Sequence, residues 1–337
     1  MPPEDPRSLA DGVVAGDKRA VARALNLVES RRLADRPAIV DLLRALDGRG
    51  KSESGHRVGL TGPPGVGKST LCAALARVYR SRGRTVAIVA VDPTSVRSGG
   101  SLLGDRARMG ASGEDAGLFF RSYATGGEAG GLTFAAHAAI TVLSAAYDVV
   151  LIETTGVGQT ETDVTLVADT VTLVLQPGSG DTLQFLKAGV MEIPDVLVVQ
   201  KADHDDLARR ALADLGAAIH TAESVGLERG DVDWRPPALA TSARTGLGVQ
   251  DLVDTFDHHR SVLAPTLAEK RRRGAVGWAV RDLERLHGSY GILVLGGRDA
   301  LVSALRTAHD RGAPAAELRE LASERYLKTV RERADAS

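Results

Sequence analysis

The segment Gly62–Ser69 reads Gly-Pro-Pro-Gly-Val-Gly-Lys-Ser and fits the phosphate-binding loop pattern G-x-x-x-x-G-K-[ST]. A short apolar run, residues 58–60, precedes this loop, and apolar residues at helical spacing follow it at Leu71, Leu75 and Val78. The sequence therefore supplies the strand, loop and helix that such a loop requires. This order predicts an α/β protein of the P-loop nucleoside triphosphatase type.

The residue types of the loop suit a phosphate group. Glycines allow backbone N–H groups to converge on an anion, and the helix that follows adds the positive end of its dipole. We expect Lys68 to reach the β- and γ-phosphates and the Ser69 hydroxyl to be a Mg²⁺ ligand. An ordinary glycine-rich turn is the alternative, and the flanking strand and helix disfavour it. The nucleotide contacts predicted here are Gly62, Pro63, Pro64, Gly65, Val66, Gly67, Lys68, Ser69 and Thr70.

Composition excludes several other classes of protein. The chain has 337 residues, of which 43% are hydrophobic and 25% charged, as in ordinary globular proteins. A net charge of -1 gives no general electrostatic reason to expect nucleic acid or an anionic membrane as a partner. The single cysteine, Cys72, excludes an internal disulfide framework. Neither a signal-peptide layout nor a run of about eighteen apolar residues occurs, so a cytoplasmic location is expected.

The pattern along the chain predicts three parts. Residues 1–55 are predicted to be an N-terminal helical extension, residues 56–262 the nucleotide-binding domain, and residues 263–337 a C-terminal helical arm. Apolar runs alternate with helical patterns in the middle part, which indicates a mostly parallel, doubly wound sheet with helices on both faces. The predicted strands are 58–60, 85–91, 148–152, 171–175, 196–199 and 238–241.

Two carboxylates stand at the ends of predicted strands. Asp92 follows the run 86–91, and Glu153 follows the run 149–152. The carboxyl ends of parallel strands face the ligand crevice, and Mg²⁺ takes one or two protein carboxylates directly or through water. Either residue is therefore a candidate for holding the ion. The alternative is that both residues only cap loops.

Further candidates lie beyond Glu153. A backbone N–H at Gly156 could meet a γ-phosphate. The segment Gln200-Lys201-Ala202-Asp203 follows one apolar run, and Thr241-Ser242-Ala243 follows another. Asp203 could accept the two N–H groups on one edge of guanine, in bonds worth roughly 1.5 to 3 kcal/mol each, which adenine does not offer. GTP is thus favoured over ATP, although a lone Lys-x-Asp at a helix start would mean little without the upstream motifs.

These motifs together resemble a known family, the methylmalonyl-CoA mutase-associated GTPases of the MeaB/ArgK-like group within the SIMIBI class of P-loop proteins. The resemblance extends from the N-terminal helices to about residue 260, and the signature Glu153–Glu161 is specific, whereas the C-terminal arm is much less so. The motifs that carry it are Gly62–Thr70, Asp92–Ser95, Gly99–Asp105, Glu153–Glu161 and Gly180–Gln184 with Lys187.

The resemblance implies a GTP-binding and GTP-hydrolysing chaperone for an adenosylcobalamin-dependent acyl-CoA mutase, one that gates cofactor loading and protects the mutase from inactivation. It implies three switch segments, at residues 95–105, 153–161 and 178–189, and a homodimer formed partly through the C-terminal helices. The metal site implied is Ser69, Asp92, Asp105 and Glu153, the catalytic residues are Lys68, Glu153 and Lys187, and the base-side contacts are Gln200, Lys201, Asp203, Ser242 and Ala243.

One residue departs from the family pattern. The base-reading motif is usually Asn-Lys-x-Asp, and Gln200 stands here in place of the Asn. The amide moves by one methylene group, a change commonly worth about 1 to 3 kcal/mol where geometry is tight. Guanine selectivity is therefore expected to be weaker, with Asp203 still discriminating.

Three other functions compete with the chaperone. A metal- or cofactor-delivery GTPase would share the fold, but eight scattered histidines and one cysteine offer no metal-rich motif. A transport-linked kinase would need a protein acceptor for the phosphoryl group, and no feature of the sequence supports one. A purely structural module is disfavoured by the intact Lys68 and Ser69.

Overall fold

The computed structural model describes residues 5–92, 115–124, 132–154, 163–178, 194–203, 205–224 and 233–335. The chain forms two compact units. One comprises residues 54–136 and 147–267, and the other comprises residues 1–53, 137–146 and 268–337. Both terminal helical segments therefore belong to the same unit.

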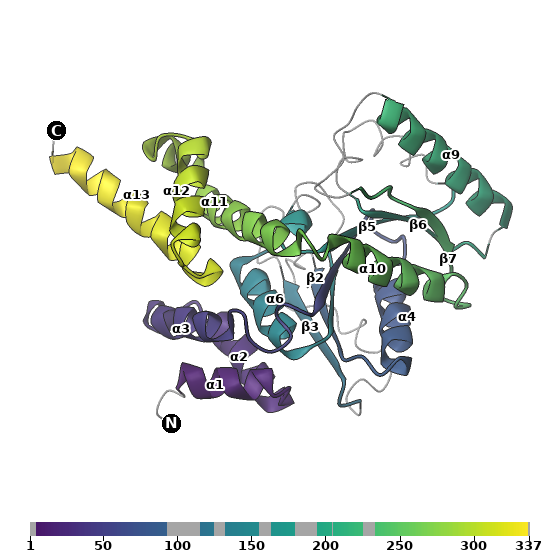
Figure 1. The fold of residues 1–337 in the computed structure, drawn as a ribbon, viewed down its shortest axis with the longest axis horizontal. Coiled ribbons are helices and arrows are strands. Elements are labelled where there is room, and N and C mark those ends of the chain that lie inside the picture. The colour runs from purple at the N-terminus through teal and green to yellow at the C-terminus, as the bar shows by residue number, and fades with distance from the viewer. Residues whose placement is uncertain are drawn as a thin grey trace, which may run out of the picture. The chain divides into compact units, whose positions relative to one another are not determined.

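The first unit is built on a seven-stranded sheet of order β3-β2-β4-β1-β5-β6-β7 (Figure 1). Every strand pairing in it is parallel. The predicted parallel α/β fold is thus confirmed. The strands are β1 His56–Thr61, β2 Val86–Asp92, β3 Leu118–Ala124, β4 Val149–Glu153, β5 Thr170–Leu175, β6 Val196–Gln200 and β7 Ala238–Thr241.

Alternation along the strands explains why helices cover both faces of this sheet. Val174 and Val198 pack with α4 (Lys68–Ser81) and α10 (Val249–Leu263), through residues such as Leu75 and Phe256. Leu173 and Leu197 point to the opposite face and pack with α9 (Asp205–Ser224). Strands buried on both faces read as continuous apolar runs, which is how β5 and β6 appear in the sequence.

The second unit is helical. Its N-terminal helices are α1 (Pro6–Val14), α2 (Lys18–Val28) and α3 (Arg36–Leu46), with the short 3-10 helix η1 (Leu33–Asp35) before α3. Asp5 and Asp17 cap α1 and α2 by accepting from backbone N–H groups. The remaining elements are most of α6 (Phe134–Ala146) and nearly all of α11 (Leu267–Val294), followed by α12 (Arg298–Asp310), η4 (Ala315–Glu317) and α13 (Leu318–Asp335).

Segments distant in sequence meet within this helical unit. Arg44 on α3 donates from Nε to Glu317 Oε1 over 2.5 Å, although 273 residues separate them. The rings of His137 and Trp278 stack with centroids 4.5 Å apart. Val280, Leu283, Leu301 and Leu318 lie in one buried core that joins α11, α12 and α13.

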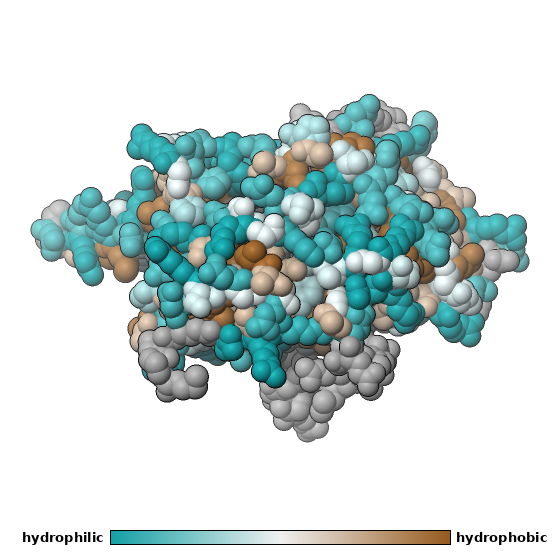
Figure 2. Space-filling model, turned by 60° about the horizontal axis from the view of Figure 1, so that its bottom comes forward, coloured by the Kyte–Doolittle hydropathy of each residue, from teal (hydrophilic) through white to brown (hydrophobic). Residues whose placement is uncertain are grey.

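None of the helices in the described ranges combines the length and the apolar composition needed to cross a bilayer. On the face shown in Figure 2, hydrophilic residues predominate and hydrophobic ones appear in small scattered groups.

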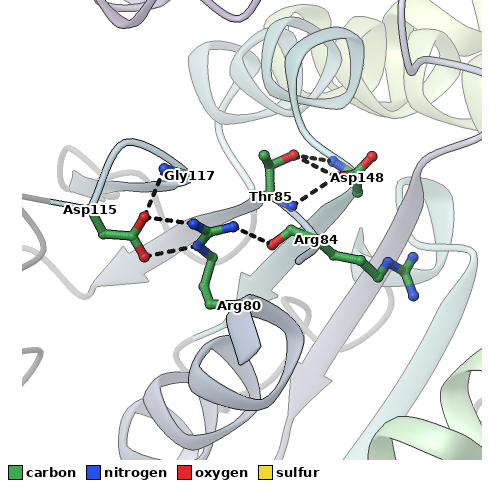
Figure 3. A network of polar contacts seen from close by, with 6 residues as sticks. All are labelled: Arg80, Arg84, Thr85, Asp115, Gly117 and Asp148. Atoms are coloured by element: carbon green, nitrogen blue, oxygen red, sulfur yellow. Dashed lines mark hydrogen bonds and ion pairs between the residues drawn. The ribbon is translucent and has the colours of Figure 1, made fainter. Parts of the chain in front are cut away.

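Polar networks fix the amino ends of the strands. Arg80, near the end of α4, forms two 2.8 Å hydrogen bonds with the Asp115 carboxylate and a third with the Arg84 carbonyl oxygen (Figure 3). Asp148 accepts from the backbone N–H and the hydroxyl of Thr85, each over 2.7 Å. Because these residues precede β2, β3 and β4, the contacts hold the starts of three strands together.

A buried chain of polar groups holds the starts of β1, β5 and β6 together. The Thr170 hydroxyl lies 2.7 Å from His56 Nε2 and 2.7 Å from His259 Nδ1, and His259 Nε2 lies 3.4 Å from Asp195 Oδ1. A hydroxyl has one proton, so a single orientation satisfies all contacts. In it His56 Nε2 donates to Thr170, Thr170 donates to His259 Nδ1, and His259 Nε2–H faces the carboxylate.

This arrangement makes the stability of the fold depend on pH. Burial lowers the pKa of His56 from 6.5 to about 3, with the nearby Asp169 acting in the opposite direction. Between pH 6.5 and pH 3, His56 binds a proton in the unfolded chain but not in the folded chain. The free energy of unfolding is therefore highest above pH 6.5 and declines as pH falls toward 3. We expect His56 to account for a loss of about 2 kcal/mol between pH 7 and pH 5.

Urea unfolding at these two pH values measures the loss. His56→Gln retains an N–H for Thr170 and does not titrate, so its pH dependence should be shallower by that amount. His220→Gln, at an exposed position of α9, is the matched control and should behave like the unmodified chain. Equal pH dependence in the His56 and His220 variants would contradict the assignment.

Candidate nucleotide-binding site

The predicted phosphate loop connects β1 to α4 at the carboxyl edge of the sheet. Gly62, Gly65 and Gly67 have φ values of 139°, 77° and 103°, a region that side chains disfavour. A Cβ at Gly62 would lie 2.0 Å from the Val174 carbonyl oxygen, so only glycine fits against β5 there. Pro64 and Gly65 are exposed, and Val66 anchors the loop in the core. The loop backbone is thus packed against β5 and the core on one side and exposed to solvent on the other.

Lys68 starts α4 and bends back over this loop. Its Nζ donates to the Gly62 carbonyl oxygen over 2.7 Å and to that of Pro63 over 3.0 Å. Only 6% of Lys68 is exposed. A buried ammonium group and the amino end of the fourteen-residue α4 thus place positive charge at the same edge.

Two of the predicted metal ligands meet beside the loop. The Ser69 hydroxyl donates to Glu153 Oε1 over 2.6 Å. Glu153 ends β4 and lies in register with Leu60 on β1 and Ala90 on β2, which brings it to the centre of the sheet edge. A hydroxyl and a carboxylate oxygen this close form a donor set of the hard type that Mg²⁺ prefers.

The base-side segments lie on the two strands beyond β5. Lys201 follows β6 with a φ of 64°, an unusual value for a residue other than glycine. Its Nζ donates to the Gly65 carbonyl oxygen over 2.9 Å and to Gln176 Oε1 over 2.7 Å. Lys201 therefore ties the segment after β6 to the phosphate loop and to the end of β5.

Asp203 is held as an anion next to the segment after β7. A hydrogen bond from Ser242 lowers the pKa of the Asp203 carboxyl, helped by its own backbone N–H and by Arg244. Arg244 Nη2 lies 2.6 Å from Asp203 Oδ2. An ionised carboxylate accepts hydrogen bonds and donates none, which suits a ligand edge that carries two N–H groups.

The structure thus brings most of the predicted site residues to one edge of the sheet. Asp92 ends β2 at that edge, and its side chain is outside the described part of the structure. Asp105, Gly156 and Lys187 lie outside the described residues, as do most of the three expected switch segments. The described residues that share this edge are Gly62–Thr70, Glu153, Gln200, Lys201, Asp203, Ser242 and Ala243.

Sequence reasoning missed two participants, Gln176 and Arg244, and the contact that Thr241 makes. Gln176 bonds Lys201, Arg244 pairs with Asp203, and Thr241 contacts the Gln200 amide. Gln176 and Arg244 each follow a strand end by one to three residues, a signal that could have identified them. Within the described ranges, no group of three or more His, Cys, Asp or Glu residues could hold a metal ion.

A parallel sheet with a phosphate loop at its carboxyl edge, a lysine over the loop and a Ser–Glu pair beside it defines a P-loop nucleoside triphosphatase. The sequence profile of the family "Methylmalonyl Co-A mutase-associated GTPase MeaB" matches residues 21–285. The chain belongs to this family of GTPases, as the motifs predicted.

Individual relatives agree with this assignment. A Mycobacterium tuberculosis protein named "Probable GTPase" is 44% identical over 283 residues, which cover 81% of this chain and 82% of that protein. The mouse (Mus musculus) "Methylmalonic aciduria type A homolog, mitochondrial" is 37% identical over 284 residues, covering 80% of this chain and 67% of that protein. The crystal structure of a "LAO/AO transport system kinase" superposes with a TM-score of 0.64 at 25% identity, covering 94% of this chain and 96% of that one.

Proposed function

We propose that this GTPase binds GTP and GDP with Mg²⁺ and serves as a chaperone for an adenosylcobalamin-dependent acyl-CoA mutase, in cofactor loading and in protection or reactivation. The observation that carries the nucleotide part is the packing of Lys68 over the phosphate loop beside the Ser69–Glu153 pair. The mutase part is supported by the family description and by the name of the mouse relative.

The loop residues have distinct tasks in this proposal. Backbone N–H groups of the loop bind phosphate oxygens, and Lys68 exchanges its carbonyl contacts for the β- and γ-phosphates. Ser69 and Glu153 hold Mg²⁺, and Asp92 and Asp105 complete its surroundings. When bound, the ion neutralises charge that develops on the phosphates. Asp203 selects guanine by accepting hydrogen bonds from the two N–H groups on one edge of the base.

Hydrolysis by the isolated chain should be slow. Unassisted small GTPases turn over at about 3 to 5 × 10⁻⁴ s⁻¹ until a further positive charge reaches the γ-phosphate. We propose that Lys187, in the third switch segment, supplies this charge when the mutase docks, and that the Gly156 N–H registers the γ-phosphate.

Steady-state GTPase assays with and without a cobalamin-dependent acyl-CoA mutase test the proposal. We expect the mutase to raise turnover, and Lys187→Ala to lose most of that increase while GDP affinity changes little. Lys328→Ala, on the exposed surface of α13, is the control. Full stimulation of the Lys187 variant would exclude Lys187, and failure of every such mutase to stimulate the unmodified chain would contradict the chaperone assignment.

One structural relative favours a second candidate, a transport-linked kinase, because that relative is named a transport system kinase. Radiolabelled GTP separates the two functions: a GTPase releases the γ-phosphate as inorganic phosphate, and a kinase transfers it to a protein. Homodimer formation through the C-terminal arm, a cytoplasmic location and the limits of the three predicted parts of the chain stay predictions.

A further inference from the structure

Gln200 is buried at the point where the base-side strands end. It is the last residue of β6, pairs in register with Thr241 on β7, and is only 3% exposed. Its Cγ lies 3.5 Å from the position that a Cβ on Gly67 would take, so the side chain also reaches the phosphate loop. A side chain enclosed in this way needs partners for both ends of its amide.

Only one orientation of the amide satisfies both ends. In it Nε2 donates to the Thr241 carbonyl oxygen over 3.1 Å and to Thr241 Oγ1 over 2.6 Å, and Oε1 accepts from the Ala243 N–H over 3.2 Å. The amide thereby clamps the start of the segment after β7 onto the end of β6. It also occupies the backbone donor of Ala243.

That donor lies next to the group expected to read the base. Arg244, the neighbour of Ala243, donates from Nη2 to Asp203 Oδ2 over 2.6 Å. On guanine, the 6-oxo group is adjacent to the N1–H and 2-amino edge that Asp203 would bind. An N–H beside Asp203 would therefore suit the 6-oxo group, but here the Gln200 oxygen accepts from it.

We propose that Gln200 is a positioning residue that determines base specificity. Its Oε1 accepts the hydrogen bond of the Ala243 N–H, so Asp203 alone recognises the base and the 6-oxo group contributes little to nucleotide affinity. This inference rests on the nucleotide site proposed above. An asparagine, one methylene shorter, would release the Ala243 N–H for the base.

The test compares GDP with 6-thio-GDP, which retains the N1–H and 2-amino edge and replaces the 6-oxo oxygen by sulfur, a weak acceptor. The unmodified chain should bind the two with affinities within about twofold. Gln200→Asn should favour GDP by roughly fivefold, the value of one hydrogen bond. Gln200→Met retains the length without the amide and should show the same shift, so one variant suffices if the other does not fold.

The ratio of the two dissociation constants is the decisive readout, since a purely structural defect would weaken both nucleotides alike. An unchanged ratio in the folded variants, or a ratio near five already in the unmodified chain, would overturn the inference and leave the proposed function intact. If the unmodified chain binds no GDP, the proposed function fails and this inference with it.

Discussion

Lys68→Ala is expected to lower kcat for GTP hydrolysis by about 10²- to 10³-fold, the usual effect of removing one group that stabilises charge in a transition state. Lys68 has a buried ammonium group that bonds two loop carbonyl oxygens beside the Ser69–Glu153 pair. Triphosphate affinity should fall by roughly 10- to 100-fold, because charge-assisted bonds to phosphate oxygens disappear. Single-turnover hydrolysis and calorimetric titration with a nonhydrolysable GTP analogue measure the two effects.

Arg77→Ala is the matched control for this substitution. Arg77 lies on the same helix, is basic and exposed, and is nine residues further along. Its removal should change neither parameter by more than about twofold, as is typical of surface sites. Hydrolysis by the Lys68 variant at the unmodified rate would show that this loop is not the active site.

Asp203→Asn is expected to change the base preference of the site from guanine to xanthine. In the proposed site the carboxylate accepts from two N–H groups of guanine, and losing two such bonds should weaken GDP binding by roughly 10²- to 10⁴-fold. An asparagine amide also brings its own N–H toward those of guanine. Xanthine has a 2-oxo group in place of the 2-amino group, so the variant should bind xanthosine diphosphate better than GDP.

Competition titrations with GDP, xanthosine diphosphate and ADP measure this exchange. Asp206→Asn is the control, since Asp206 lies three residues further along, is exposed and pairs with Arg209. Tight GDP binding by the Asp203 variant, or equal affinity of the unmodified chain for ADP, would contradict the base assignment.

Local sequence predicted most of the sheet but missed β3. The runs that form β1, β2, β4, β5 and β6 are apolar because these strands are buried on both faces. The short run that forms β7 is also apolar, although β7 lies at the other edge of the sheet and is only partly buried. β3 pairs only with β2 at the edge of the sheet, and Arg121 and Ser122 interrupt its apolar pattern. An edge strand with one neighbour needs no continuous apolar run, so periodicity alone did not reveal it.

In the site, too, some features follow from local motifs and others depend on which strands are neighbours in the sheet. Motif spacing predicted the loop and Lys68, because both depend on one strand end and the residues that follow it. It also predicted that Ser69 and Glu153 share one edge of the sheet, where their contact joins residues 84 positions apart. The contacts of Gln176 with Lys201 and of Arg244 with Asp203 join residues 25 and 41 positions apart. Such pairings depend on strand order, which the sequence did not specify.

The helical unit has a consequence for how the chain is made on the ribosome. Arg44 leaves the ribosome early, and its partner Glu317 follows 273 residues later. At about 5 to 20 residues per second this delay is roughly 14 to 55 s. The sheet unit, complete at residue 267, can fold within that interval, whereas α3 gains its contact with η4 only when the last part of the chain has emerged. Nascent chains stalled where residue 267 has left the ribosome and Glu317 has not should therefore present a protected sheet unit, with N-terminal helices more sensitive to protease than in the full chain.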